Sequence, residues 1–211
     1  MASGFMDIAS TPSVKAARTA MGSADLWSDP RRDRPSERFG EAEAAFIAGR
    51  DGAFLASVSE TGWPYVQHRG GPPGFLKVLD ETTLGFADYR GNRQYISLGN
   101  VTADDRVALI MVDYPNRRRL KLFGHLSVVG LAEDPALAAA LAVPGGRGMA
   151  ERSVLIRLAG FDWNCPQHIT PRFSEAELAA ALEPIRGRLA ALEAENRELR
   201  DRLAGRPATD E

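Results

Sequence analysis

The chain has 211 residues, of which 44% are hydrophobic and 26% charged, and this balance suits one globular domain with appended segments. Its 26 Lys and Arg against 28 Asp and Glu give a formal net charge of −2, which disfavours nucleic acid and anionic membranes as partners. A single cysteine excludes an internal disulfide, and three histidines without ligand spacing indicate no metal site.

Residues 1–35 are rich in Ser, Ala, Pro and Arg and show no sustained apolar period. They predict an N-terminal arm, or short helices lying over the domain. The first twenty residues lack the apolar core of a signal peptide, and no later run approaches the ~18 apolar residues of a membrane span. We therefore expect a cytoplasmic protein.

Residues 36–172 have the pattern of a β-rich domain. A helix is predicted over 36–50, with Ser36 as its N-cap, and a short helix over 92–99. Seven apolar runs bounded by turn residues predict strands: AFLASVS (53–59), WPYVQHR (63–69), FLKVL (75–79), TLGFA (83–87), RVALIMVDY (106–114), RLKLFGHLSVV (119–129) and RSVLIRLAG (152–160). The pattern favours a mainly β, antiparallel barrel with flanking helices over an alternating βα sheet.

Residues 173–211 predict a long amphipathic helix with a capping box at Ser174 and Glu177. Apolar residues recur at alternating intervals of four and three, at 178, 182, 185, 189, 192, 199 and 203, and Asn196 occupies the remaining seam position. This pattern is typical of a parallel two-stranded coiled coil, although the same helix could instead pack on its own barrel. Pro184 is expected to kink the first heptad.

The stretch GFADYRGNRQYISLGN, residues 85–100, is the first that suggests chemistry. A strand that passes through a Gly-Asn turn into a helix would make Asn92 the N-cap. The backbone N–H groups of Arg93 and Gln94, together with the Arg93 guanidinium, would then form a phosphate site. The simpler alternative is a capped helix whose arginine is solvated.

Two further cationic stretches accompany it. In VQHRGGPPGFLKVLD, residues 66–80, Arg69 and Lys77 lie on consecutive strands joined by a Gly/Pro-rich loop that lets the backbone approach a flat ligand. In NRRRLKLFGH, residues 116–125, a β period places Arg119 and Lys121 on one face and apolar residues on the other.

Taken in this order, these stretches resemble the pyridoxamine 5'-phosphate oxidase-like family of FMN-binding split barrels. DYRGNRQYISLGN and DWNCPQHITPRF are similar to its predicted flavin-nucleotide-binding branch, and the resemblance covers roughly residues 36–172. It implies a six-stranded antiparallel split barrel that works as a homodimer, with FMN at the subunit interface.

The resemblance also implies roles for individual residues. Arg69 would contact FMN, Lys77 would lie near the flavin or substrate, and Arg119 or Lys121 would reach the polar edge of the isoalloxazine. The family's phosphate-binding triplet matches Asn92, Arg93 and Gln94, and Asp88 lies in the same stretch. In FDWNCPQHITPRF, residues 161–173, the candidates are Trp163 against the flavin face and Gln167 at its polar edge, with Cys165 or His168 facing the substrate.

The chain departs from the oxidase at its C-terminus, where a charged heptad helix replaces the segment that grips pyridoxal phosphate. We therefore expect an FMN-dependent oxidoreductase with a different small-molecule substrate or electron donor, and Lys77, Cys165 and His168 are its catalytic candidates. Two alternatives remain open. One is a flavin-binding electron-transfer or sensor module without turnover, and the other is a haem-binding split barrel that uses His68, His125 or His168.

Overall fold

A computed structural model describes residues 4–27, 37–144, 148–163 and 167–204. The chain forms two compact units, Met1–Ile169 and Thr170–Glu211. In the described ranges no helix is both long enough and apolar enough to cross a membrane.

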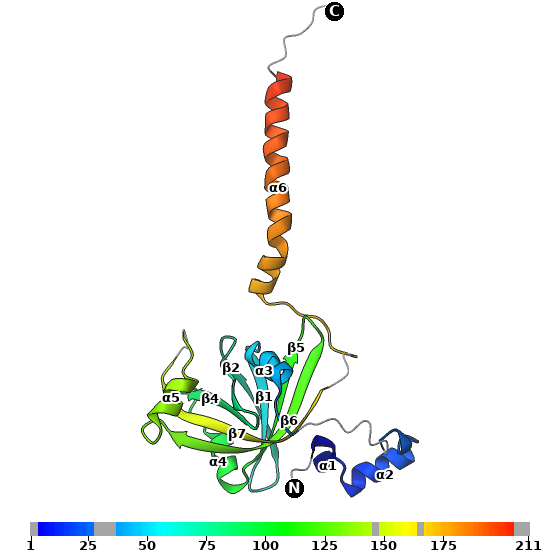
Figure 1. The fold of residues 1–211 in the computed structure, drawn as a ribbon, viewed down its shortest axis with the longest axis vertical. Coiled ribbons are helices and arrows are strands. Elements are labelled where there is room, and N and C mark those ends of the chain that lie inside the picture. Colours follow the sequence, from blue (N-terminus) through cyan, green and yellow to red (C-terminus); the bar gives the residue numbers. More distant parts are fainter. Residues whose placement is uncertain (1–3, 28–36, 145–147, 164–166, 205–211) are drawn as a thin grey trace, which may run out of the picture. The chain divides into compact units, whose positions relative to one another are not determined.

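The first unit contains one antiparallel sheet of seven strands, and each run predicted as a strand forms one (Figure 1). This is one strand more than the six that the family resemblance implied. The strands are β1 (Gly52–Val58), β2 (Pro64–Gly70), β3 (Lys77–Asp80), β4 (Thr83–Tyr89), β5 (Arg106–Asp113), β6 (Arg118–Gly130) and β7 (Ala150–Trp163). Their order in the sheet is β2-β1-β5-β6-β7-β4-β3.

Strict alternation along the strands gives the sheet two different faces. On β6, Leu120 and Leu122 are buried, whereas Arg119 and Lys121 point to the opposite face, as the sequence predicted. The inner face joins a single hydrophobic core with residues from β1, β4, β5 and β7, among them Leu55, Leu84, Leu109 and Ile156. The outer face of β1 leaves Phe54 41% exposed.

Helices occur before, between and after the strands along the chain. They are α1 (Phe5–Ala9), α2 (Pro12–Ala20), the 3-10 turn η1 (Asp25–Trp27), α3 (Glu41–Ala48), α4 (Ile96–Ala103), α5 (Pro135–Leu141) and, in the second unit, α6 (Glu175–Ala204). The helix expected over 36–50 begins only at Glu41. The N-cap there is Gly40, whose N–H donates to the Glu43 carboxylate at 2.9 Å, and Ser36 lies outside the described residues.

The N-terminal arm packs on the outer face of the sheet. The Phe5 ring of α1 stacks on Phe123 of β6, with ring centroids 4.5 Å apart. A Cβ on Gly160 of β7 would lie 2.5 Å from the Phe5 backbone nitrogen, so a residue without a side chain is needed at this contact. Part of the arm thus covers β6 and β7, as expected for short helices lying over the domain.

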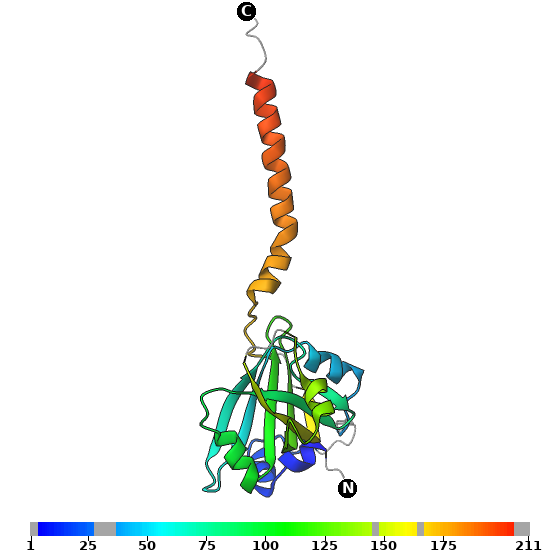
Figure 2. The same cartoon turned by 90° about the vertical axis from the view of Figure 1, so that its left-hand side faces the viewer.

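The sheet curls until β2, at one end of the strand order, approaches β4 near the other end (Figures 1 and 2). The two strands meet through side chains, with Arg69 of β2 at 3.0 Å from Asp88 of β4. Helix α4 lies at this junction, where Ser97 donates to Gln67 and the buried Asn100 donates to Ser57, each at 3.0 Å. A barrel closed in this way is a split barrel, and we refer to the β2/β4 junction as the split.

The close approach of β6 and β7 at Gly124 gives a stability prediction. A Cβ there would lie 2.6 Å from Ile156 Cγ2 and 2.7 Å from the Arg157 carbonyl oxygen, at a shift in the β6/β7 register. We expect Gly124→Ala to lower the free energy of unfolding by about 1–3 kcal/mol in a urea titration. Gly99→Ala is the matched control, because Gly99 lies inside α4 with open space around it, and this change should raise stability by about 0.5–1 kcal/mol. Equal effects of the two changes would contradict the close approach.

Candidate functional site

Two adjoining hollows lie along the split, and Arg69, Asp88 and Tyr89 line both. The larger has a volume of about 420 Å³ and is bounded by His68–Pro72 and Phe86–Tyr89, with Phe75 and Val143. The smaller has a volume of about 170 Å³ and extends past Asn92 and Arg93 to the first turn of α4. Together they form one cleft, in which the smaller hollow is the polar end and the larger end has a mixed lining that includes Phe75, Phe86 and Val143.

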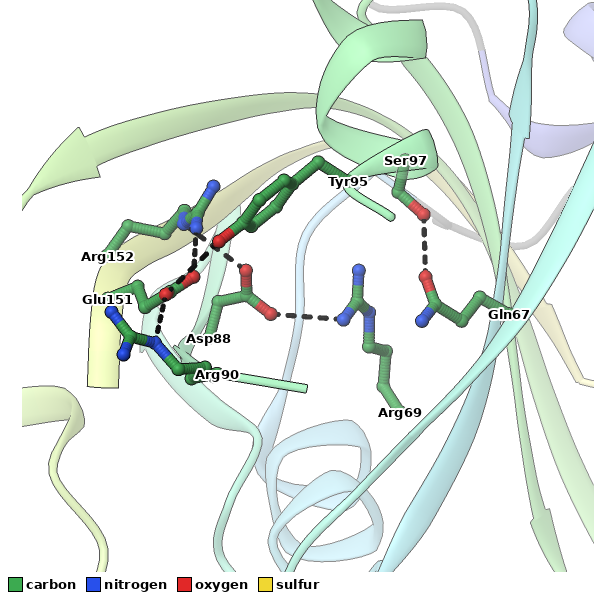
Figure 3. A network of polar contacts seen from close by, with 8 residues as sticks. All are labelled: Gln67, Arg69, Asp88, Arg90, Tyr95, Ser97, Glu151 and Arg152. Atoms are coloured by element: carbon green, nitrogen blue, oxygen red, sulfur yellow. Dashed lines mark hydrogen bonds and ion pairs between the residues drawn. The ribbon is translucent and has the colours of Figure 1, made fainter. Parts of the chain in front are cut away.

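A network of ion pairs forms the wall of the polar end (Figure 3). The Asp88 carboxylate faces two guanidinium groups, that of Arg69 at 3.0 Å and that of Arg152, from β7, at 3.4 Å. The side chains of Arg69 and Arg152 are 21% and 13% exposed, so water screens these pairs less than it would on the surface. Asp88 therefore fixes the positions of both cations.

Glu151, next to Arg152 on β7, is the second carboxylate of the network. It accepts hydrogen bonds from Arg90 Nε at 2.8 Å and from the Tyr95 hydroxyl at 3.2 Å, and it also pairs with Arg152. The Arg152 guanidinium lies over the Tyr95 ring at 5.0 Å. The hydrogen bond from Arg90, with those from Arg152 and Tyr95, holds the pKa of Glu151 below its ordinary value, so this carboxylate stays ionised in the cleft.

The loop before α4 differs from its prediction. Asn92 is not the N-cap, because the helix begins at Ile96 and runs past Gly99 to Ala103. Asn92 instead folds the loop on itself, with its side-chain oxygen accepting the Gln94 N–H at 3.1 Å. Arg93 and Tyr95 both have left-handed backbone conformations, with φ of 60° and 52°. The N–H groups free at the helix start therefore belong to residues 96–98, which line the cleft.

The polar end of the cleft carries a net positive charge. The guanidinium groups of Arg69, Arg90 and Arg152 face only two carboxylates, and Arg93 adds another cation to the lining. The excess of two positive charges matches a phosphate monoester, which carries about two negative charges. The buried Nε–H of Arg69 also has no acceptor in the part of the chain that the structure describes. A buried donor without a partner is costly, so its presence beside the cleft favours an anionic ligand there.

The cleft brings together four of the predicted site residues, Arg69, Asp88, Asn92 and Arg93. Gln94 bonds to Asn92 in the same loop and is exposed. Lys77 is directed elsewhere, because its ammonium donates to the carbonyl oxygens of Ala140 and Ala142 at 2.6 and 2.9 Å. These carbonyls belong to the C-terminal end of α5, where a cation stabilises the helix dipole.

The other two predicted cations lie on the outer face of β6. Lys121 forms an ion pair with Asp162 at 3.0 Å, and its ammonium lies 4.8 Å from the centre of the Phe5 ring. Arg119 is half-buried, and its Nε–H has no acceptor among the described side chains. Because Arg69 points to the inner face of the sheet, these two residues and Arg69 lie on opposite faces of one chain.

The segment after β7 lies apart from the cleft walls. Trp163 donates from Nε1 to Glu43 at 2.8 Å and packs edge-on against Phe46. Gln167 and His168 are exposed in a turn, where His168 has a φ of 63°. Cys165 lies outside the described residues. Trp163, Gln167 and His168 are therefore not part of the cleft lining that the described residues of this chain form.

Sequence reasoning missed five residues of the site: Gln67, Tyr95, Ser97, Glu151 and Arg152. Tyr95 and Ser97 lie within residues 85–100, the stretch in which the sequence predicted a phosphate site. Side chains alternate between the two faces of a strand, so the sequence of β2 would have placed Gln67 on the same face as Arg69. Glu151 and Arg152 gave no local signal, because they reach the cleft only through the pairing of β4 with β7.

The fold and the cleft define a class: a split barrel with a positively charged cleft where the ends of its sheet meet. Residues 39–157, more than half of the chain, match the family described as Pyridoxamine 5'-phosphate oxidase. The chain belongs to this family. A search of curated proteins found no match.

Solved structures of similar fold are distant in sequence. One is a putative pyridoxamine 5'-phosphate oxidase from Lactobacillus delbrueckii, with 20% identity, a TM-score of 0.46, and coverage of 61% of this chain and 96% of the other. An F420 reductase shows 21% identity and a TM-score of 0.42 over 59% and 98% of the two chains. HutZ, described as a haem storage protein of Vibrio cholerae, shows 14% identity and a TM-score of 0.37 over 56% and 89%. At these levels the likeness identifies neither cofactor nor substrate.

The Glu151 network gives a pH prediction. Since its folded-state pKa is lowered, Glu151 contributes stability that is full above its ordinary pKa of 4.5 and is lost as the pH falls through the lowered value. Glu151→Gln should therefore cost most near neutral pH, and its free energy of unfolding should converge with that of the wild type in acid. Urea titrations between pH 7 and the acid limit of folding would measure this. Glu60→Gln, in an exposed turn, is the control that should show no such convergence. A gap that persists unchanged in acid would contradict the role of the ionised carboxylate.

Proposed function

We propose that this protein binds FMN in the split and acts as an FMN-dependent oxidoreductase on a small molecule other than pyridoxamine phosphate. The observation that carries the proposal is the polar end of the cleft, where arginines outnumber carboxylates and Arg69 keeps a buried donor without an acceptor. Family membership supports a flavin, and the exposed helix in place of the oxidase terminus supports a changed substrate.

The polar end suits the phosphate of the cofactor. Arg93 supplies a cation without an ion-pair partner among the described residues, and the start of α4 supplies backbone donors and the positive end of a helix dipole. Asp88 and Glu151 keep the neighbouring guanidinium groups in place without cancelling their charge. These residues would therefore hold the phosphate and set the depth of the ring in the larger end of the cleft.

Contacts to the polar ring edge would come from a second copy of the chain. Arg119 and Arg69 lie on opposite faces of the sheet, so both can meet one flavin only if a homodimer shares the site. The outer face of β1, β2 and β5 is apolar enough for such pairing, with Phe54, Val58 and Val66 36–59% exposed. Of the two β6 cations, Arg119 is the better candidate, because Lys121 is already paired with Asp162. A guanidinium there would stabilise negative charge on the reduced ring.

When bound, FMN would supply the electron transfer, and the protein would supply binding, orientation and electrostatics. Asp88 and Glu151 are both engaged by arginines, so neither is available as a general base. Their task is to orient cations. A proton for the substrate would come from water or from the exposed segment after β7, where His168 lies.

Because arginines engage both described carboxylates of the network, a second candidate is a flavin-binding module that transfers electrons or senses redox state without its own turnover. The two candidates differ in a steady-state assay of the FMN-loaded protein with NADH or NADPH and a soluble electron acceptor. Turnover well above that of free FMN would exclude the module. Bound flavin that neither nicotinamide reduces would favour it.

A haem-binding function would need a histidine ligand, and His68 lies beside the larger hollow of the cleft, although its ring is on the outer face of β2. The His68 ring is held edge-on against Phe54, with centroids 5.5 Å apart, and lies beside Gly52 and Gly70. His125 is already bonded to Asp105 at 2.8 Å. Adding haem to the protein and to His68→Ala tests this candidate. A Soret band that is identical in both would exclude ligation by His68.

We expect the purified protein to take up FMN and to show flavin absorption that survives desalting. Arg93→Ala should weaken FMN binding by about tenfold to a hundredfold, because a charge-assisted hydrogen bond is lost. Arg38→Ala is the matched control, since Arg38 is an exposed arginine paired with Glu81 away from the cleft, and it should bind FMN as the wild type does. Fluorescence quenching of FMN measures both affinities. No FMN affinity in any of the three proteins would overturn the proposal.

The shared site gives a separate prediction. Val66→Glu places a carboxylate on the exposed outer face of β2, so the free energy of unfolding should change by less than about 0.5 kcal/mol. FMN affinity should nevertheless fall at least about tenfold, because burying an unpaired charge opposes pairing of the outer faces. Thr61→Glu, in the exposed β1–β2 turn, is the control that should retain affinity. Unchanged affinity in Val66→Glu would show that one chain binds the flavin alone.

A further inference from the structure

Helix α6 is a 30-residue helix, and none of its residues is buried. Its larger apolar side chains Leu178, Ile185, Leu189, Leu192, Leu199 and Leu203 are 43–67% exposed. An isolated helix with a stripe of this kind is marginal in water and gains most of its stability by covering that stripe. The charges beside the stripe indicate what covers it.

The stripe follows a heptad repeat without interruption. Leu182, Leu189, Asn196 and Leu203 occupy the a positions, and Leu178, Ile185, Leu192 and Leu199 occupy the d positions. Pro184 falls at a c position, away from the seam, but it removes a backbone hydrogen bond in the helix. The part with an intact backbone therefore extends from Ile185 to Leu203.

The positions that flank the seam carry complementary charges. Arg188 and Glu195 occupy successive g positions, and Glu193 and Arg200 occupy the e positions that follow them. In a parallel, in-register pair, each g residue faces the e residue of the next heptad in the partner. Arg188 would then face Glu193 of the second copy, and Glu195 would face its Arg200, so every such pair is of opposite sign.

An antiparallel pair fits less well. There, g faces g and e faces e, so the stagger with the longest overlap of the Ile185–Leu203 segment sets Glu195 against Glu195 and Glu193 against Glu193 of the two copies. A shift of one heptad to either side matches opposite charges, for example Arg188 with Glu195, but shortens the overlap of that segment. In all three staggers Asn196 faces a leucine or an isoleucine, which leaves its buried amide without a partner. In the parallel register Asn196 faces the Asn196 of the second copy, and the two amides can bond to each other.

We propose that α6 pairs with the α6 of a second copy as a parallel, in-register, two-stranded coiled coil from Ile185 to Leu203. The partner is this chain itself, because the e and g charges complement their own sequence. The proposal does not depend on the flavin: it concerns a different unit of the chain and different residues.

Site-specific cross-linking of the full-length protein tests both partner and register. In a Cys165→Ser background, Leu199→Cys places a thiol at a d position, opposite the same thiol only when the pair is parallel and in register. Most of the chain should become a covalent dimer in an oxidised glutathione buffer. Asp201→Cys, at an f position on the far side of the helix, is the matched control and should remain uncross-linked. Equal cross-linking at both positions, or no cross-linking at position 199, would overturn the proposal. Absence of cross-linking at 199 would mean that the apolar stripe of α6 packs against the barrel or against a different protein.

Charge reversal tests the pairing of g with e. In the Leu199→Cys protein, Glu195→Arg should lower the equilibrium constant for the interchain disulfide on the order of tenfold, because two attractive pairs become repulsive. Adding Arg200→Glu restores opposite signs and should recover most of the loss. A double variant as weak as the single one would overturn the proposed register, even if the two copies remained associated.

Discussion

The contact between Arg69 and Asp88 closes the sheet, and the remainder of the site depends on it. Backbone hydrogen bonds join each strand to its neighbour from β2 round to β3, but β2 and β4 meet through side chains. At that junction a cation and an anion lie 3.0 Å apart, and Arg152 adds a second cation from β7. Removing one member of a half-buried pair leaves the other uncompensated, so the cleft keeps its width only while the network is complete.

In the proposed function, the two faces of the sheet have different roles: one binds the ligand and the other pairs with a second chain. The inner face of β2 supplies Gln67 and Arg69 to the cleft, and the alternate residues of the same strand, Val66 and His68, belong to the outer face. A one-residue change of register would exchange these sets. The same alternation separates Arg69 from Arg119, which is why a flavin site that uses both requires two chains. Ligand binding and oligomeric state are therefore linked in the proposed function.

Local patterns predicted much of the fold, because each strand is a short alternating run between turn residues. They were wrong about the start of α4, since an Asn followed by Arg is a common N-cap sequence, whereas here left-handed conformations at Arg93 and Tyr95 delay the helix to Ile96. They missed Glu151 and Arg152, whose partners lie about sixty residues earlier in the chain. Strand number was predicted correctly from the runs themselves and was too low by one in the family resemblance. Pairing across a sheet is a tertiary property that spacing along one sequence does not encode.

The strand order also has a consequence for the route by which the protein folds. Phe54 pairs with Ile110 and Thr83 with Arg157, so β1 and β4 both find partners more than fifty residues away. Closing such long loops costs entropy before any contact repays it, and sheets of this topology fold in roughly milliseconds to seconds. The hairpin of β5 and β6 needs only a short turn and can form early. The split needs β2 and β4 both in place, so the cleft is among the last parts of the molecule to exist, and a ligand that binds there, as proposed, would select chains that have finished folding.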